Sequence, residues 1–191
     1  MLCFAEDFHL TPNKTLLQQI RADWNNHEKD WTRPGFRALA FYRLGVWRMT
    51  IRNKFLRAPF SLLYRSLYRR ARNLYGIELP YSASVGSDVV IEHQGGIVIH
   101  GNCRIGHGSI IRQGVTLGNR YMDRPFDAPE LGNRVNVGAG AKILGAVKIG
   151  DHAVIAANAV VLQDVPAAHL AAGIPAKIRP LKSSVSMGET S

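Results

Sequence analysis

Cysteine is scarce in this 191-residue sequence. Its two cysteines, Cys3 and Cys103, stand a hundred positions apart, and neither belongs to a CxxC pair or has histidines at zinc-ligand spacing. Disulfide-stapled domains and structural zinc sites need denser clusters of these residues. The sequence therefore predicts neither a disulfide scaffold nor a metal site.

Long apolar runs and a secretory leader are missing as well. No apolar stretch approaches the roughly 20 residues that a membrane span needs, and the first ten residues, MLCFAEDFHL, carry acidic side chains where a secretory signal has basic ones. We therefore expect a cytoplasmic protein. The length suits one core domain with a helical extension.

Acidic residues are absent from one long segment. Residues 31–77 contain eleven Lys or Arg and no Asp or Glu, whereas the whole chain has a formal net charge of +10. Three interpretations of the basic helices 35–75 stay open: a solvated or subunit-packing face, peripheral docking on an anionic membrane, and, least favoured, nucleic acid. Nothing resembles a base-reading motif, so we expect no nucleic-acid partner.

The first third of the chain has helical patterns. Residues 11–30 predict a polar helix, with Thr11 as N-cap and Pro12 at the first helical position. A second helix is expected from Pro34 through residue 52, and a third from Pro59 to Gly76, whose glycine suits a helix end.

From Tyr81 onward the chain repeats with a period of six. Aliphatic residues recur at this spacing in three series, and small residues often follow them. The series are Val85, Ile91 and Ile97; Ile99, Ile105, Ile111 and Leu117; and Leu131, Val137, Ile143, Ile149, Ile155 and Val161. Such a repeat predicts a left-handed parallel β-helix, in which each hexapeptide forms one side of a triangular coil and stacked coils share an aliphatic core.

Two segments interrupt this period, and interruptions of a solenoid are where functional loops leave the coil. They are residues 92–96, EHQGG, and the excursion 118–130. We expect helices over 1–80, the β-helix over 81–180 with its active-site loop at 118–130, and a flexible tail over 181–191.

Several segments together resemble the serine acetyltransferase branch of the hexapeptide acyltransferases. The segment IEHQGGIVIHG is similar to that family's DHxxGIVIGE, and PGFRALAFYRLGVWR, QGVTLG, VNVGAGAKILG and AAGIPAK also match it. The loop has features of the colanic-acid type of polysaccharide acetyltransferase. The resemblance implies a homotrimer, with acetyl-CoA as co-substrate in the groove between adjacent prisms.

The resemblance also implies roles for individual residues. His93 would be the general base, because an imidazole titrates near neutral pH, and Glu92 would orient it or contact the acceptor. The acceptor would meet Asp23, Arg120, Arg124 and Asp127. The residues implied for CoA are Asn119, Ala139, Gly140, Ala157, Gly173, Ile174, Pro175 and Lys177, with Arg179 beside them.

The loop departs from the family where Arg-His-Pro is expected. The chain has Asp127-Ala128-Pro129 there, so the second histidine is missing. His107 is the best substitute, although it is expected to face outward like His100 and His152. Asp23 has a competing interpretation as part of a solvated helix face. Serine O-acetylation, O-acetylation of a sugar hydroxyl in polysaccharide synthesis, and a non-catalytic trimeric scaffold remain the three hypotheses, in that order.

Overall fold

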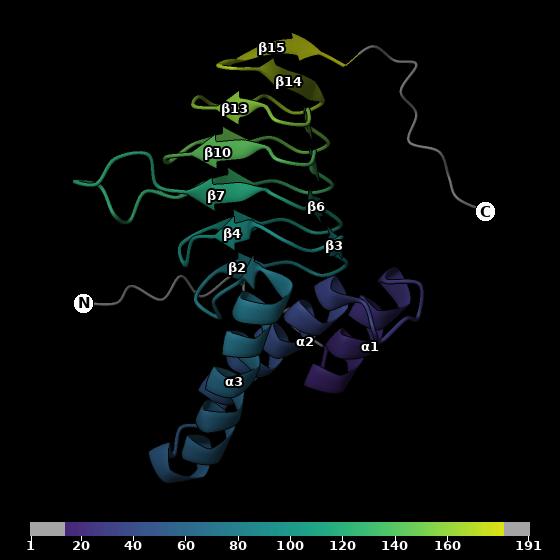
Figure 1. The fold of residues 1–191 in the computed structure, drawn as a ribbon, viewed down its shortest axis with the longest axis vertical. Coiled ribbons are helices and arrows are strands. Elements are labelled where there is room, and N and C mark those ends of the chain that lie inside the picture. The colour runs from purple at the N-terminus through teal and green to yellow at the C-terminus, as the bar shows by residue number, and fades with distance from the viewer. Residues whose placement is uncertain (1–13, 182–191) are drawn as a thin grey trace.

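The computed structural model describes residues 14–181, which form a group of helices followed by a stacked solenoid (Figure 1). Helix α1 spans Leu16–Asn26, α2 spans Pro34–Trp47, and α3 spans Lys54–Tyr75. A short 3-10 helix, Arg48–Thr50, follows α2 directly. The helices lie at the first coils of the solenoid, and α3 projects away from it. Within the described residues no helix is long and apolar enough to cross a membrane.

Two of the three helix starts differ from the sequence-based predictions, whereas α2 begins at Pro34 as predicted. Thr11 and Pro12 lie outside the described residues, and α1 instead begins after Thr15, whose hydroxyl caps the amide of Gln18 in a reciprocal capping box. Pro59 does not start α3 but lies inside it. The Asn53 side chain accepts bonds from two amides of the first turn and so starts the helix earlier. The predicted end at Gly76 is confirmed, with φ of 64°.

Fifteen short strands form the rest of the described chain. Parallel pairing gathers them into three sheets, and only β14 and β15 pair antiparallel. The strands are β1 Ile77–Glu78, β2 Ser84–Val85, β3 Val90–Glu92, β4 Ile97–Ile99, β5 Arg104–Ile105, β6 Ile110–Arg112, β7 Thr116–Gly118, β8 Glu130–Leu131, β9 Asn136–Val137, β10 Lys142–Leu144, β11 Lys148–Ile149, β12 Val154–Ile155, β13 Val160–Val161, β14 His169–Gly173 and β15 Ala176–Pro180.

The three sheets are the walls of a triangular prism. The first sheet contains β1, β4, β7, β10 and β13; the second contains β2, β5, β8 and β11; the third contains β3, β6, β9, β12, β14 and β15. Each coil therefore adds one strand to each wall, as the six-residue period predicts. The predicted parallel β-helix is confirmed, and its first strand, β1, precedes Tyr81, where the period first becomes visible.

The aliphatic series form the core of the prism. Ile99 lies beside Leu117 in register, and Leu117 beside Ile143, so that identical positions stack from coil to coil. Both Ile97 and Ile99 of β4 are buried, which explains the two-residue displacement between the first two series. Burying such side chains stabilises the fold by about 1.5–3 kcal/mol each.

Candidate active site

One edge of the prism is formed where the third sheet turns into the first. Its corner segments are 93–96, 113–115, 138–141 and 156–159, and we call it the His93 edge. The amide of Gly114 donates to the carbonyl of Gly95, and that of Gly140 to the carbonyl of Gln113, at 2.9 and 2.8 Å. These bonds stack the corners directly above one another.

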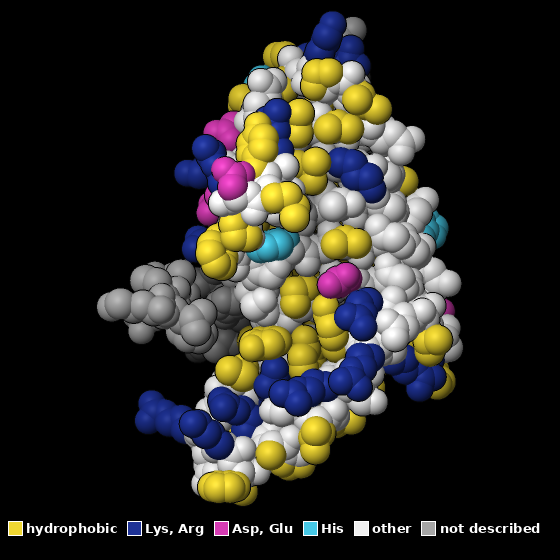
Figure 2. Space-filling model, turned by 60° about the vertical axis from the view of Figure 1, so that its left-hand side comes forward, with side chains coloured by type: hydrophobic (Ala, Val, Ile, Leu, Met, Phe, Trp, Pro, Cys, Tyr) yellow, Lys and Arg dark blue, Asp and Glu magenta, His cyan; other side chains and the backbone are white. Residues whose placement is uncertain are grey.

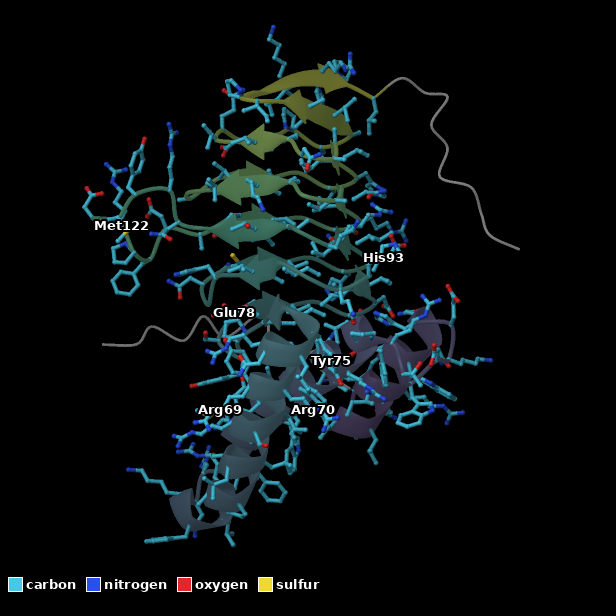
Figure 3. The ribbon with its side chains drawn as sticks, viewed as in Figure 1. Arg69, Arg70, Tyr75, Glu78, His93 and Met122 are labelled. Atoms are coloured by element: carbon cyan, nitrogen blue, oxygen red, sulfur yellow. The ribbon has the colours of Figure 1, made fainter. Side chains whose placement is uncertain are left out.

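His93 is at the first of these corners, immediately after β3 (Figure 3). Its backbone has φ of 64°, and the following Gly95 and Gly96 also have positive φ, a region that glycine adopts without steric cost. The amide of Gly95 donates to the carbonyl of Tyr75 at the end of α3. The corner is therefore braced by a helix, while the imidazole of His93 is exposed.

Glu92 makes a contact that the sequence did not suggest. Its carboxylate lies 2.7 Å from Nε of Arg112, its register neighbour in β6, and Arg112 also donates to the side chain of Asn136. Glu92 therefore forms an ion pair with Arg112 of the next coil. The expected role of Glu92 beside the imidazole stays a prediction.

The residues expected to bind CoA gather mostly on the same edge. Ala139, Gly140 and Ala157 lie at its successive corners, where the amide of Asn158 donates to the carbonyl of Ala139 at 2.8 Å. Gly140 has φ of 74°, and a Cβ built there would lie 2.0 Å from Oδ1 of Asn158. Glycine and alanine predominate at these corners, and the Asn158 side chain and the Lys142 ammonium lie against Gly140 and Gly114.

The turn between β14 and β15 completes the His93 edge. Strand β14 pairs in register with β12, so its C-terminal end lies above the corner that follows β12. Gly173, Ile174 and Pro175 form this turn, and Lys177 and Arg179 are exposed on β15. Four strand spacings separate this turn from the coil of His93, or roughly 19 Å. The edge offers a long, small-residue surface with cations at its far end.

The excursion 118–130 lies at a different edge, where the first sheet turns into the second. We call this the loop edge. Figure 3 shows Met122 on the loop and His93 on opposite sides of the solenoid. The loop is exposed, with Met122 at 93% and Phe126 at 79% exposure. One chain therefore does not bring its loop to its own His93.

The loop residues that were expected in the site therefore lie away from His93 of the same chain. The guanidinium groups of Arg120 and Arg124 lie 5.0 and 5.8 Å from the ring centre of Tyr121. The Asn119 amide donates to the carbonyl of Tyr121, and so Asn119 lies apart from the other residues expected to bind CoA. Asp127 is on the same loop, and Ala128, the residue expected at the position of the family's second histidine, is buried.

Asp23 is part of a buried polar network, so its interpretation as a solvated helix face is wrong. Its carboxylate lies 3.0 Å from Nε of Arg43, and Arg43 also donates to the carbonyls of Val85 and Gly86. Burial raises the pKa of Asp23, although Arg43 opposes this shift. The sequence reasoning missed Arg43, whose place inside the apolar stretch FYRLGVW was the available signal.

His27 connects this network to the strand that precedes His93. Its Nδ1 lies 2.6 Å from the carbonyl of Asp23, and its Nε2 accepts the amide of Ile91 at 3.3 Å. One ring nitrogen thus faces a backbone acceptor and the other a backbone donor, an arrangement that suits the tautomer with its proton on Nδ1. The helices thus hold β3 in place two residues before His93.

His107 lies at the third edge, between β5 and β6. Its Nδ1 faces the amide of Ser87 at 3.0 Å, and the corners above and below it stack through the carbonyls of Ser87 and His107. One chain therefore does not bring His107 to His93. His152 shares this third edge, with φ of 58°, and His100 lies at the loop edge.

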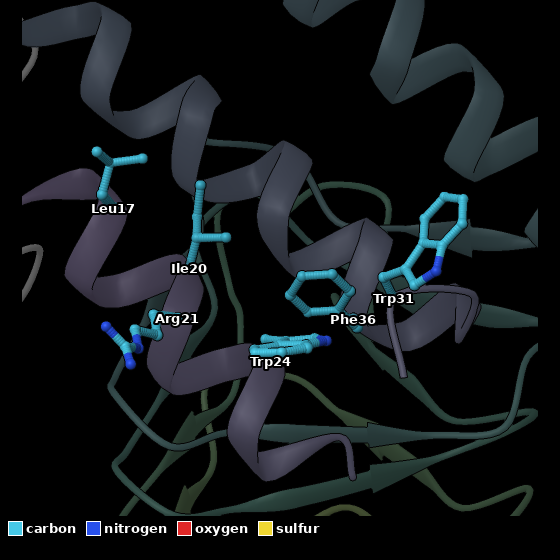
Figure 4. Close-up of a pocket in the computed structure, with 6 residues that line it drawn as sticks. All are labelled: Leu17, Ile20, Arg21, Trp24, Trp31 and Phe36. Atoms are coloured by element: carbon cyan, nitrogen blue, oxygen red, sulfur yellow. The ribbon is translucent and has the colours of Figure 1, made fainter. Parts of the chain in front are cut away.

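A separate apolar hollow lies among the helices (Figure 4). It measures about 350 Å³ and is lined by Leu17, Ile20, Arg21, Trp24, Trp31 and Phe36. None of the candidate residues lines it, and its only titratable group is the Arg21 guanidinium. It offers no acid–base chemistry. Within residues 14–181 no group of three or more His, Cys, Asp or Glu side chains could hold a metal ion.

Comparisons with known proteins match family models to two segments of the solenoid. Residues 128–163 match the family model of the bacterial transferase hexapeptide (six repeats), and residues 96–120 match that of the hexapeptide repeat of succinyl-transferase. The serine acetyltransferase of Helicobacter pylori is 40% identical over 162 residues, covering 85% of this chain and 91% of the relative.

Two of the similar solved structures contain a bound ligand. The serine acetyltransferase of Neisseria gonorrhoeae in complex with serine is 28% identical, with a TM-score of 0.70, and the match covers 86% of this chain and 69% of that one. The Brucella abortus serine acetyltransferase in complex with coenzyme A is 27% identical, with a TM-score of 0.71, covering 87% and 66%.

Proposed function

Because this chain belongs to the serine acetyltransferases of the bacterial hexapeptide-repeat transferase family, we propose that it transfers the acetyl group of acetyl-CoA to the hydroxyl of serine. The observation that carries the proposal is the His93 edge. A single exposed imidazole lies at one end of this edge, and the β14–β15 turn with its cations lies at the other. Relatives of this fold bind serine and coenzyme A.

The donor fits the His93 edge chemically. Small residues such as Ala139, Gly140 and Ala157 let an extended pantetheine arm approach the backbone, and Lys177 and Arg179 can face phosphate groups. Bound acetyl-CoA supplies a thioester carbonyl near the corner of His93. Serine would be held by its carboxylate, for which Arg120 and Arg124 are suitable bidentate partners.

In the proposed reaction His93 acts as the general base. The imidazole takes the proton of the acceptor hydroxyl as its oxygen attacks the thioester carbonyl, and the carbon–sulfur bond then breaks. The imidazolium returns the proton to the leaving thiolate, so that the products are the O-acetyl ester and free CoA thiol. An imidazole can perform both transfers, as a base when neutral and as an acid when protonated.

We further propose that the complete site forms between two copies in a homotrimer. His93 and the loop lie on opposite sides of one chain, and the exposed apolar side chains Met122 and Phe126 fit burial against a neighbour. In a closed ring each copy presents its His93 edge to the loop of the next. Every site then receives its base from one chain and its acceptor-binding residues from another.

The loop supports a second acceptor class. Ala128 stands where the family has its second histidine, and Asp123, Asp127 and Glu130 add acidic acceptors of the kind that sugar hydroxyls use. O-acetylation of a sugar hydroxyl is therefore the second proposed function.

The test is release of CoA thiol from acetyl-CoA by the purified protein, offered L-serine and then nucleotide sugars and oligosaccharides. Burial raises the pKa of Cys103 to about 12, so this thiol stays protonated and contributes little to the signal. Turnover with serine at millimolar levels would support the first function. Turnover with a sugar alone would support the second, and inactivity with every acceptor would indicate a scaffold.

A further inference from the structure

Helix α3 carries an apolar surface at the end that projects from the solenoid. We use the name α3 tip for a group of exposed apolar side chains. They are Met49, which precedes α3, and Phe55, Leu56, Phe60, Leu62 and Leu63. Phe55 is 91% exposed, and Leu56 and Leu62 are about two-thirds exposed. Tyr64 and Ala71 form the buried side of this helix. The tip is thus the outward face of an amphipathic helix, at the point farthest from the candidate active site (Figure 1).

Cations surround the tip and continue along the helix. Arg52, Lys54 and Arg57 flank the apolar side chains, and Arg65, Arg69, Arg70 and Arg72 follow toward the solenoid. Figure 2 shows this arrangement, with hydrophobic atoms at the lower end of the molecule and a band of Lys and Arg above them. No Asp or Glu occurs between residues 48 and 75, so no acid of this segment neutralises the band.

We propose that the α3 tip docks on an anionic lipid bilayer. Apolar side chains at a helix tip enter the boundary of the acyl chains, while adjacent arginines contact the phosphate-bearing headgroups. A second copy packed tip to tip would instead bring like-charged bands together, which disfavours that contact. Nucleic acid would use the cations but leave Phe55 and Leu62 in water. Of these three occupants, the bilayer is the one that complements both parts of the surface.

The proposal is independent of the acetyl transfer and is tested by sedimentation of the full chain with vesicles. Vesicles of phosphatidylcholine with about one-third phosphatidylglycerol should bind the protein at least about tenfold more tightly than pure phosphatidylcholine. Raising the salt from about 0.1 to about 0.5 M should weaken this binding. The variants Phe55→Ser/Leu62→Ser and Arg52→Gln/Lys54→Gln should each weaken it about tenfold, with unchanged melting temperature.

Matched controls come from another helix. Leu17→Ser and Arg21→Gln remove an equally exposed apolar side chain and a cation from α1, and both should bind anionic vesicles like the unaltered protein. Equal binding to neutral vesicles, no binding at all, or an equal loss in the α1 variants would overturn the proposal. So would a fall in oligomeric mass in Phe55→Ser/Leu62→Ser, which would make the tip a contact between copies, or binding to duplex DNA that the Phe55 and Leu62 changes leave intact.

Discussion

Two edges of the same prism are built in opposite ways. The His93 edge consists mostly of glycines and alanines joined by backbone hydrogen bonds, and it presents one imidazole. The loop edge opens at residues 118–130 into a projection of arginines, acids and exposed apolar side chains. The His93 edge suits binding of an extended acetyl-CoA and general base catalysis, whereas the loop edge suits recognition of the acceptor. Because they face different directions, a site that uses both needs two chains.

The helices brace the first coil through the buried Asp23–Arg43 pair, whose guanidinium donates to the carbonyls of Val85 and Gly86, and breaking this brace should have the largest effect. Asp23→Ala leaves the buried Arg43 without its carboxylate, and removing one partner of a buried ion pair costs about 3–5 kcal/mol. Chemical denaturation should show this loss. The exposed pair of Glu28 and Arg33 is the control, and Glu28→Ala should change stability little. An equally small loss for Asp23→Ala would contradict the proposed brace.

Removing the base of the His93 edge should have the next largest effect. His93→Ala should lower kcat by about 100-fold or more, because general base catalysis contributes at least that much. The side chain is exposed, so the melting temperature and the CoA dissociation constant should hardly change. His152→Ala, which removes an exposed histidine from the third edge, is the matched control. Full activity of His93→Ala would refute the mechanism.

Substitutions on the loop edge should weaken binding of the acceptor and leave binding of acetyl-CoA unchanged. Arg120→Ala and Arg124→Ala each remove a cation proposed to bind the serine carboxylate, and the loss of one charge-assisted hydrogen bond raises KM for serine about tenfold. Steady-state kinetics with serine and with acetyl-CoA separate the two sites. A rise confined to the KM of acetyl-CoA would reverse the roles given to the two edges.

The smallest effect is expected from one methyl group on the His93 edge. Gly140→Ala adds a Cβ at φ of 74°, where it meets Oδ1 of Asn158, and such strain costs about 1–2 kcal/mol. We expect CoA binding several-fold weaker by calorimetry. Gly118→Ala is the control at the loop edge, where the nearest atom to the new Cβ is 3.9 Å away. If both variants bind CoA equally well, the donor does not lie against Gly140.

The solenoid could be predicted from the sequence because each aliphatic residue of the series performs the same task in every coil. Ile143, Leu117 and Ile99 stack because they share one position in the repeat. His93 and the loop could be found because they interrupt that repeat. The assignment of all the CoA residues to one edge, Asn119 excepted, depends on where the strands turn, which the period alone does not reveal.

The polar contacts could not be predicted in the same way. The network of Asp23, His27 and Arg43 joins residues from two helices to two strands, and no local pattern in the sequence brings such distant partners together. The starts of α1 and α3 differ from the prediction because Thr15 and Asn53 supply side-chain caps, which the positions of the prolines do not reveal.

The central claim, a site shared between two chains, is tested most directly by mixing two inactive ones. One chain carries His93→Ala, and the other has its loop 118–130 shortened to a corner like residues 100–103; each is expected to be inactive alone. Co-expression with two different tags isolates mixed oligomers. In a mixed trimer one interface in three combines an intact His93 with an intact loop, whichever chain is present twice, so the isolated mixed trimers should have roughly a third of the normal activity per site. Mixed oligomers that contain both chains and remain inactive would contradict the account.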